Sequence, residues 1–372
     1  CTASRACSRC CRVPAIDRMR PGGTDPGLAP HEQRQRAFEA LRALLGRLAA
    51  AGPLVLVLDD LHWGDVDSAA LLRELLRPPD PPPLLLIVSY RSDAASSSCI
   101  AALRGGLAAA PGLHRADLEL RPLAPEAALQ LARQLLVDSS RSGEAAAIAR
   151  ESGGSPLVIS ELCHFTRDAD TRALGEAPTF EAVLRRRIAG LDPASRALLE
   201  VVVVAAEPID PELAAAVAEH DGDPLPRIAA LRRDHLLRSH RADGQTTVEA
   251  FHERVRGALV DDMDPQRQRR IHHALAKALE RLPDADPERL RRHFEAAGEP
   301  ARAAHHALQA AARATAALAF DRAAALYRIA LAHAEPDDRP RLGRLLGDAL
   351  ANDGRGVEAA EAYLRAAERL EG

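Results

Sequence analysis

Lysine is almost absent from this chain of 372 residues. Its one lysine, Lys277, lies in residues 271–279, which have a helical pattern and contain no glycine. A phosphate-binding loop of the form G-x-x-x-x-G-K-[ST] needs a lysine directly after a glycine, and protein kinases need a lysine on a strand. The sequence therefore excludes both of these phosphate-binding devices from this chain.

Aromatic residues are also scarce, at 3% of the chain, whereas the helix-favouring residues alanine, leucine and arginine are abundant. Apolar residues make up 47% and charged residues 27%, which is enough for buried cores. The formal net charge of −4 excludes a chain-wide basic surface, so nucleic acid is not an expected partner. At about 150 residues per domain, the length predicts two to three mostly helical domains.

Long hydrophobic runs are missing as well. No apolar run approaches the roughly 18 residues needed to span a bilayer, and the first residues carry no secretory signal. We therefore expect no membrane partner and a cytoplasmic location. Cys7 and Cys10 form a C-x-x-C pair, but no second pair follows at a spacing typical of zinc sites. Pro-Gly pairs predict instead that residues 1–30 form a disordered leader.

A strand–helix–strand unit is predicted between residues 54 and 90. Residues 54–58 are a continuous apolar run, typical of a strand buried on both faces of a parallel sheet, and residues 84–90 are predicted as a second buried strand. A helix over residues 69–76 joins them as a right-handed crossover. A helix and a short third strand are predicted nearby, over residues 31–50 and 118–120.

The rest of the chain alternates helical patterns with glycine or proline breaks. Helices are predicted over residues 125–137, 144–151 and 156–167. Residues 180–263 predict three helices and then a polar hairpin through Asp243-Gly244. From about residue 265 onward the pattern indicates helical hairpins only.

An internal repeat occurs in this last part. Ala323-Ala324-x-x-Tyr327-x-x-Ala330 recurs as Ala359-Ala360-x-x-Tyr363-x-x-Ala366, at an offset of 36 residues. A period near 34 residues is typical of helical repeats, in which neighbouring hairpins stack because one alone cannot bury its apolar face. The alternative is a chance similarity between alanine-rich helices.

Two carboxylates, Asp59 and Asp60, end the first predicted strand. Ligands of parallel sheets bind at the carboxyl ends of strands, where one carboxylate can hold hydrated Mg²⁺ and a second can polarise an attacking water. The alternative is that both acids cap a turn. The longer string Asp-Asp-Leu-His-Trp-Gly-Asp at residues 59–65, which holds the chain's one tryptophan, favours the catalytic interpretation. Within it, His62 and Trp63 are expected to pack or hydrogen-bond rather than to catalyse.

The string at residues 59–65 resembles the Walker B region of STAND-type AAA+ ATPases, signal-transduction ATPases found beside bacterial kinase, cyclase and regulator domains. Other segments resemble the family's next strand, its short strand and lid, its G-x-P turn, the end of its winged helix and the start of its repeats. In that order they are residues 84–91, 118–136, 154–157, 251–256 and 293–304. The resemblance spans about residues 30–335.

The resemblance implies roles for five residues. It makes Asp59 a ligand of Mg²⁺ through water, Asp60 the carboxylate that acts on the attacking water, and Arg91 a sensor. It places Gly154 and Pro156 near the adenine of bound ATP. The residues alone leave two alternatives open: Arg91 can equally be a solvated arginine, and the turn with Gly154 can equally be a helix stop.

The implied fold class is mainly α with a partial α/β domain: an incomplete parallel AAA+ sheet, a winged-helix-like domain and α-helical TPR-like repeats. After the leader, the predicted domains are a partial nucleotide-binding core, a helical lid, the winged-helix-like domain and the repeats. Their boundaries are residues 31–120, 121–178, 179–264 and 265–372.

The chain departs from the family because the phosphate-binding loop that should precede the Walker B strand is missing. Truncation of a longer gene product would explain this, so we expect the parent protein to use ATP and Mg²⁺, and this chain alone to bind ATP weakly or not at all. Two functions remain: a fragment of an ATP-driven signalling switch, or a nucleotide-independent interaction scaffold or regulator module of a bacterial serine/threonine kinase. Both imply a protein partner on the C-terminal repeats, and whether the chain is an enzyme stays open.

Overall fold

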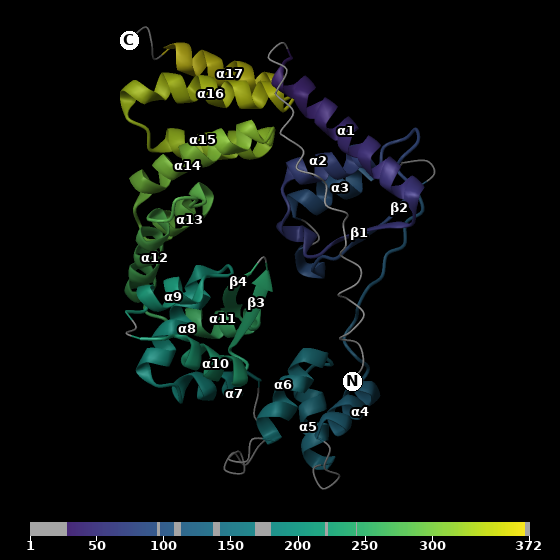
Figure 1. The fold of residues 1–372 in the computed structure, drawn as a ribbon, viewed down its shortest axis with the longest axis vertical. Coiled ribbons are helices and arrows are strands. Elements are labelled where there is room, and N and C mark those ends of the chain that lie inside the picture. The colour runs from purple at the N-terminus through teal and green to yellow at the C-terminus, as the bar shows by residue number, and fades with distance from the viewer. Residues whose placement is uncertain are drawn as a thin grey trace. The chain divides into compact units, whose positions relative to one another are not determined.

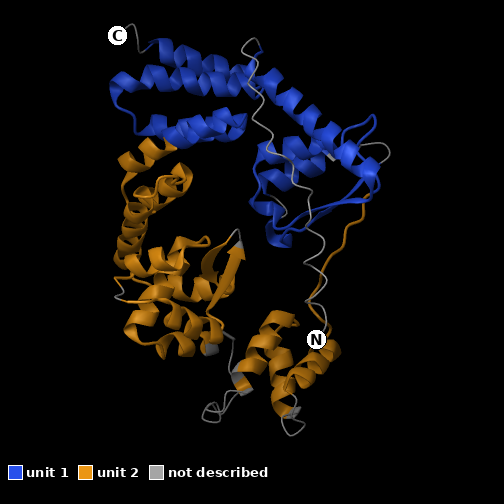
Figure 2. Cartoon of the chain, viewed as in Figure 1, with its two compact units in different colours: residues 1–114, 308–372 blue, residues 115–307 orange. Residues whose placement is uncertain are grey.

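The computed structural model of the chain describes residues 28–94, 97–107, 113–136, 142–167, 180–219, 222–242 and 244–368 (Figure 1). The predicted leader, with Cys7 and Cys10, lies almost entirely outside these residues. Two compact units can be separated, one of residues 1–114 and 308–372 and one of residues 115–307 (Figure 2). We call them unit 1 and unit 2 and describe each by itself. Among the described residues, no helix is long and apolar enough to cross a membrane.

The predicted strand–helix–strand unit is present in unit 1. Strand β1 (Leu54–Leu58) pairs in parallel with β2 (Leu84–Val88), in a register that sets Leu58 opposite Val88. Helix α2 (Val66–Leu75) makes the crossover that parallel strands require, and Asp65 begins it by accepting a hydrogen bond from the Ser68 N–H at 2.7 Å. The remaining elements are a short 3₁₀ helix at each strand end and two helices: η2 (Leu61–Trp63), η3 (Ser92–Ala94), α1 (Pro30–Ala51) and α3 (Ser98–Leu107).

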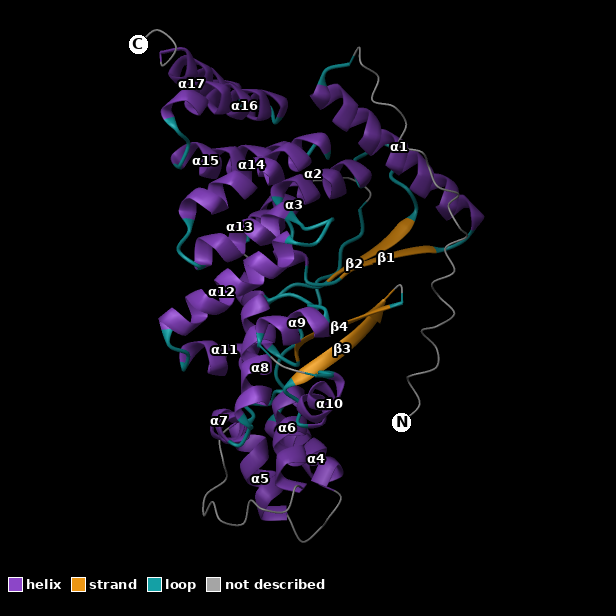
Figure 3. Cartoon of the chain, turned by 60° about the vertical axis from the view of Figure 1, so that its left-hand side comes forward, coloured by secondary structure: helices purple, strands orange, loops and turns teal. Residues whose placement is uncertain are grey.

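One face of this sheet packs on a small core built mainly from α2 and α3, with Ala69, Leu72, Cys99 and Ile100 buried. The other face is open among the described residues: Val57 is 60% exposed and Ile87 is 46% exposed. The prediction that both faces are buried is therefore wrong for this part of the chain. The prediction of an incomplete sheet is correct, since β1 and β2 pair only with each other within the described segments (Figure 3).

The C-terminal part of unit 1 consists of antiparallel helices. Helices α15 (Phe320–Ala332), α16 (Arg339–Asn352) and α17 (Gly356–Glu368) pack in sequence order, with a 3₁₀ turn η6 (Pro336–Asp338) before α16. Alanines fill the seams between these helices, and two glycines of α16 permit its close approach to α17. A Cβ atom on Gly347 would lie 2.4 Å from the Tyr363 ring.

The repeat prediction is supported by where its two tyrosines lie. Tyr327 is buried in the core shared by α15 and α16, and its hydroxyl is 3.4 Å from that of Thr315 on the preceding helix, α14 (Pro300–Ala316). The Tyr363 hydroxyl donates to Asp348 of the preceding helix, α16, at 2.9 Å. As expected for the last helix of the array, α17 leaves Val357 and Leu364 exposed.

Unit 2 begins with a three-helix group, α4 (Pro125–Leu136), α5 (Ser142–Glu151) and α6 (Pro156–Arg167). Residues 118–120, predicted as a strand, are unpaired, so that prediction is wrong. Leu118 is 88% exposed and Leu120 is 96% exposed. Alternating leucines gave the strand signal, but without a neighbouring strand or a core to cover them the segment has no partner for its backbone.

The rest of unit 2 surrounds α8 (Pro193–Ala205), whose valine-rich C-terminal half is fully buried. Burial in this core outweighs the weak helix propensity of valine. The predicted hairpin is present as β3 (Leu237–Ala242) paired antiparallel with β4 (Gln245–Ala250). Within the described residues, four helices precede the hairpin instead of the three predicted: α7 (Phe180–Ala189), α8, α9 (Pro211–Val217) and α10 (Leu225–Arg233). Helices α11 (Glu253–Asp261), α12 (Pro265–Glu280) and α13 (Pro287–Ala296) follow it.

A pair of histidines, His272 and His293, joins α12 to α13. The Nδ1 atoms of His272 and His293 are 3.0 Å apart, so at least one ring must be neutral. Burial lowers the pKa of His293 to about 3, helped by His272, Arg289 and Arg292. Burial and Arg256 lower the pKa of His272 as well.

We therefore predict that stability falls as the pH drops below about 6.5, because the unfolded chain then binds protons that the folded histidines exclude. Replacing His293 by Gln should remove much of this dependence, worth about 1–2 kcal/mol at pH 5. Urea unfolding at pH 7 and pH 5 measures it, with exposed His333→Gln as the control. Equal acid sensitivity in the native chain and in H293Q would contradict the prediction.

Candidate functional site

The two aspartates after β1 meet the residue that follows β2. The Ser89 N–H donates to the Leu58 carbonyl at 3.0 Å, and the Leu61 N–H donates to the Ser89 carbonyl at 2.8 Å. The Ser89 hydroxyl accepts from the Asp60 N–H at 2.8 Å and donates to the Asp59 carboxylate. Ser89 thus holds both aspartates at the carboxyl edge of the sheet.

Asp60 turns the chain sharply after the strand. Its φ of +54° is in the left-handed region, where aspartate is tolerated better than most residues. This turn leaves the Asp59 and Asp60 carboxylates exposed to solvent. Two exposed carboxylates beside a serine hydroxyl can hold a hydrated cation and can accept a proton from water.

His62 lies beneath this edge. Its side chain is only 6% exposed, and its Nδ1 lies 3.8 Å from the Asp60 carboxylate. Within the described part of the chain, this Nδ1 has no hydrogen-bond partner. Trp63, by contrast, is 79% exposed and contacts the His62 ring at a centroid distance of 5.2 Å. Their expected role in packing therefore fits His62, whereas the Trp63 ring faces solvent.

Two further residues of the 59–65 string have local structural roles. Position 64 has little room for a side chain, because a Cβ atom on Gly64 would lie 2.8 Å from the Cys99 sulfur. Asp65 caps α2, as described above. The Asp59 carboxylate, by contrast, is bonded to Ser89 and remains open to solvent on its other side.

Arg91, the proposed sensor, lies two residues beyond Ser89. It makes a bidentate contact with Asp93, with Nε–Oδ1 and Nη2–Oδ2 distances of 3.0 and 2.7 Å. This hydrogen-bonded pairing lowers the pKa of Asp93. Both side chains are exposed, as the solvated-arginine alternative expects. Movement of Arg91 toward a ligand would require it to leave this pair.

Gly154 and Pro156, proposed to lie near adenine, belong to unit 2. Gly154 has a φ of +80°, and a Cβ atom there would lie 2.4 Å from the Leu123 carbonyl oxygen. Its own carbonyl accepts from the Leu123 N–H at 2.9 Å. Pro156 is the first residue of α6, a position that suits proline. Both residues are therefore explained locally, as the helix-stop alternative expects, and a nucleotide role for them stays a prediction.

The carboxylate and hydroxyl oxygens at the sheet edge fit Mg²⁺, one of the two ligands that the resemblance implies. Oxygen ligands suit Mg²⁺, which keeps most of its waters and binds through one or two carboxylates. No group of three or more histidine, cysteine or acidic residues that could hold a metal occurs in the described ranges, at this edge or elsewhere. The phosphates of ATP fit less well, because lysine is missing from the whole N-terminal part of the sequence.

Reasoning from the sequence alone did not identify Ser89 as a member of this site. A signal was available, because Asp59 and Ser89 both follow directly after strands that end together in parallel register. Polar residues in these positions meet at one edge of the sheet.

We predict that Ser89→Ala lowers the free energy of unfolding by about 1 kcal/mol, since it leaves the Asp60 N–H without its acceptor. Urea unfolding measures the change. Ser92→Ala, three residues downstream, is the matched control and should stay within about 0.5 kcal/mol of the native chain. Similar losses in both variants would mean that the Ser89 contacts are not specific.

Residues 6–88 match the protein-family model described as AAA ATPase domain, although residues 6–27 of this match lie outside the described residues. Along more of its length the chain is similar to the crystal structure of a Signal Transduction ATPase with Numerous Domains (STAND) protein with a tetratricopeptide repeat sensor, from Pyrococcus horikoshii. The identity is 16% and the TM-score 0.48, covering 92% of this chain and 52% of that one. This chain thus spans about half the length of that structure. No curated protein matches it. The resemblance to AAA+ ATPases expected from the 59–65 string is therefore confirmed for residues 6–88.

Proposed function

We propose that the chain is part of a STAND-type ATPase switch, in which nucleotide at the carboxyl edge of β1 and β2 controls the packing of the ATPase core on the helical repeats. The observation that carries the proposal is the contact of Ser89 with both Asp59 and Asp60, at the edge where parallel sheets bind ligands. The match of residues 6–88 to an ATPase domain supports it.

In this proposal each side chain has one task. Asp59 holds the waters around Mg²⁺, and Ser89 fixes its orientation. Asp60 accepts a hydrogen bond from the attacking water and orients it. A bound Mg²⁺ supplies charge compensation for the phosphates. As the resemblance to the family implies, Arg91 acts as the sensor arginine, and Gly154 and Pro156 lie near the adenine.

We predict that this chain by itself binds Mg-ATP more weakly than about 1 mM and shows no turnover, because it has no phosphate-loop lysine. Calorimetric titration measures binding, and the emission of Trp63, the chain's one tryptophan, reports on the edge beside Asp60. Micromolar affinity would overturn the prediction.

The roles of the two aspartates are separable once a phosphate-loop segment is joined ahead of the chain. Asp60→Asn should then reduce hydrolysis far more than binding, whereas Asp59→Ala should weaken the Mg²⁺-dependent part of binding. The exposed Asp117→Asn serves as the control. Equal and mild effects of both substitutions would assign the aspartates to the turn alone.

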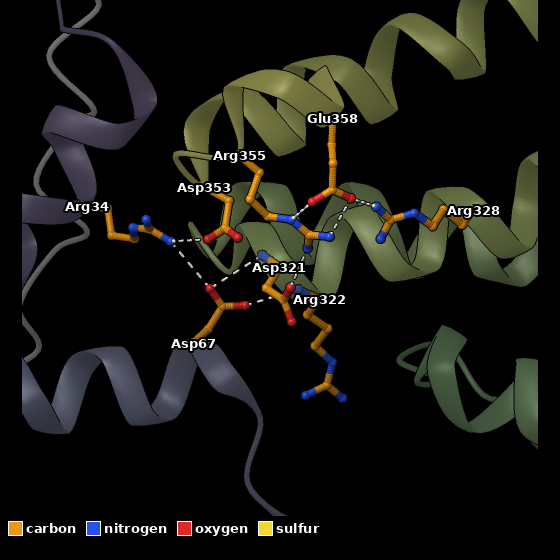
Figure 4. A network of polar contacts seen from close by, with 8 residues as sticks. All are labelled: Arg34, Asp67, Asp321, Arg322, Arg328, Asp353, Arg355 and Glu358. Atoms are coloured by element: carbon orange, nitrogen blue, oxygen red, sulfur yellow. Dashed lines mark hydrogen bonds and ion pairs between the residues drawn. The ribbon is translucent and has the colours of Figure 1, made fainter. Parts of the chain in front are cut away.

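A physical link between the ATPase core and the repeats exists within unit 1 (Figure 4). The backbone N–H groups of Asp321 and Arg322, in the first turn of α15, donate to the Asp67 carboxylate at 3.5 and 3.1 Å. Ala319, at the N-cap position of α15, has no side chain that could do this. Asp67 of α2 therefore caps a helix that lies about 250 residues further along the chain.

Arginines extend this link on both sides of Asp67. Arg34 of α1 lies 3.3 Å from Asp67 and 3.4 Å from Asp353, at the turn between α16 and α17. Arg322 lies 3.1 Å from Asp65, the last residue of the 59–65 string. A change at the edge of the sheet can thus reach the repeats through the start of α2.

We predict that Asp67→Ala speeds hydrogen exchange at the Asp321 and Arg322 amides and destabilises the docked repeats by about 0.5–2 kcal/mol, the usual cost of a lost helix cap. Burial raises the pKa of Asp67, so Asp67→Asn, which keeps an acceptor oxygen, should have a smaller effect. Asp117→Ala is the exposed control. Unchanged exchange at both amides would show that Asp67 does not cap α15.

A second candidate function is a nucleotide-independent scaffold that binds a protein through its repeats. The exposed Val357 and Leu364 on α17 favour it, because they are two turns apart on one helix face. Retained partner binding in Asp59→Ala and Asp60→Asn variants, but not in Leu364→Glu, would support the scaffold over the switch. As part of this second candidate function, we also propose that the chain is a regulator module of a bacterial serine/threonine kinase and is located in the cytoplasm.

A further inference from the structure

Unit 1 contains a cavity that is not lined by Asp59 or Asp60 at the sheet edge. It is an open cavity of about 900 Å³, lined by α1, α2 and the turn between α16 and α17. This volume falls in the range of small-molecule sites. On α1 the lining residues recur at the helical spacing i, i+3, i+4 and i+7: His31, Arg34, Gln35 and Phe38. Residues so spaced share one helix face. From α2 come Ala70, Arg73 and Glu74, and Arg77 and Pro78 follow just beyond the end of that helix at Leu75.

The arginines around the cavity differ in the acidic partners that they have. Arg34 is paired with Asp67 and Asp353, and Arg77 lies 3.3 Å from Glu74. Arg73, in contrast, has no ion pair in the segments that the structure describes. Its side chain lies against α3 at Gly106, where a Cβ atom would be 2.0 Å from the Arg73 Nε. The missing side chain of Gly106 therefore makes room for a guanidinium group that forms no ion pair among the described residues.

We propose that this cavity binds a small organic anion, a phosphate or carboxylate group joined to an apolar body. Arg73 on α2 and Arg77, two residues beyond the end of that helix, present two guanidinium forks, the groups best suited to bidentate contact with such anions. Phe38, Ala70 and Pro78 supply an apolar wall for the body of the ligand. No residue of the candidate nucleotide site lines this cavity, so the proposal does not depend on the proposed function.

Binding of an anion in this cavity affects the contacts that join α1 and α2 to the helical repeats. Arg34 and Asp353, which join α1 to the turn before α17, both line it. An anion that bridges α2 to this wall adds contacts that exist only when the repeats are docked, so its binding stabilises the docked arrangement.

Phenyl phosphate is a suitable probe for the full chain, with inorganic phosphate and phenol as its two halves. We expect saturable calorimetric binding of phenyl phosphate, at least about tenfold tighter than that of either half. Arg73→Ala should weaken it about tenfold, the usual effect of a lost charge-assisted hydrogen bond. Glu74→Gln should tighten it, because it removes the acid that competes for Arg77.

Gly106→Ala tests the geometry without removing charge. The added methyl group displaces Arg73 and should weaken binding as Arg73→Ala does, while alanine remains favourable in helix α3. Arg36→Ala, on α1 but outside the cavity lining, is the control and should bind like the native chain. Non-saturable titration, equal weakening by Arg36→Ala, or phosphate binding as tightly as phenyl phosphate would each overturn the proposal.

Discussion

The parallel pairing of β1 with β2 is the constraint on which the candidate site depends. Because Leu58 lies opposite Val88, the next residues of both strands emerge together, and Ser89 reaches Asp59 and Asp60 at once. An antiparallel pair would have placed these residues at opposite edges of the sheet. The pairing in turn depends on α2, which crosses from β1 to β2 and is started by Asp65. The strand ends, the helix cap and the site therefore form a single local structure over residues 54–89.

The same stretch also faces the repeats. Asp65 caps α2 with one oxygen and pairs with Arg322 through the other, and Asp67 caps α15. Isolated surface ion pairs contribute about 0–1 kcal/mol, and burying charge opposes even that gain. The caps, which satisfy backbone N–H groups that would otherwise lack partners, are the more stabilising part of the link. The arginines around them mainly fix which elements meet. Arginine suits this purpose because its planar fork can contact two carboxylates, as Arg34 does with Asp67 and Asp353.

Local sequence patterns were sufficient to predict most elements and the position of the two aspartates. Two apolar runs indicated the strands, the acids after the first run indicated the edge of the candidate site, and helical spacing with glycine or proline breaks indicated the helices. The open face of the sheet was not predictable, because Val55 and Val57 have the same sequence pattern whether or not another element covers them. Residues 118–120 alternate like a strand, but a strand also needs a neighbour. Contacts such as that of Asp67 with α15 join residues far apart in the chain, and no local pattern encodes them.

Hydrolysis and phosphate binding make different demands on charge, and the roles proposed for Asp59 and Asp60 concern only the first. The carboxylates of Asp59 and Asp60 are suited to orient water and hold a hydrated cation, but they repel the phosphates of a nucleotide. A phosphate loop normally offsets this repulsion with backbone N–H donors, a helix N-terminus and a lysine. A phosphate loop stabilises the nucleotide in the ground state and the transition state alike, whereas a carboxylate that orients the attacking water stabilises mainly the transition state. Affinity for nucleotide and rate of hydrolysis should therefore depend on different segments. In the proposed function, the residues after β1 can keep their geometry, and their link to α15, whether or not nucleotide is held.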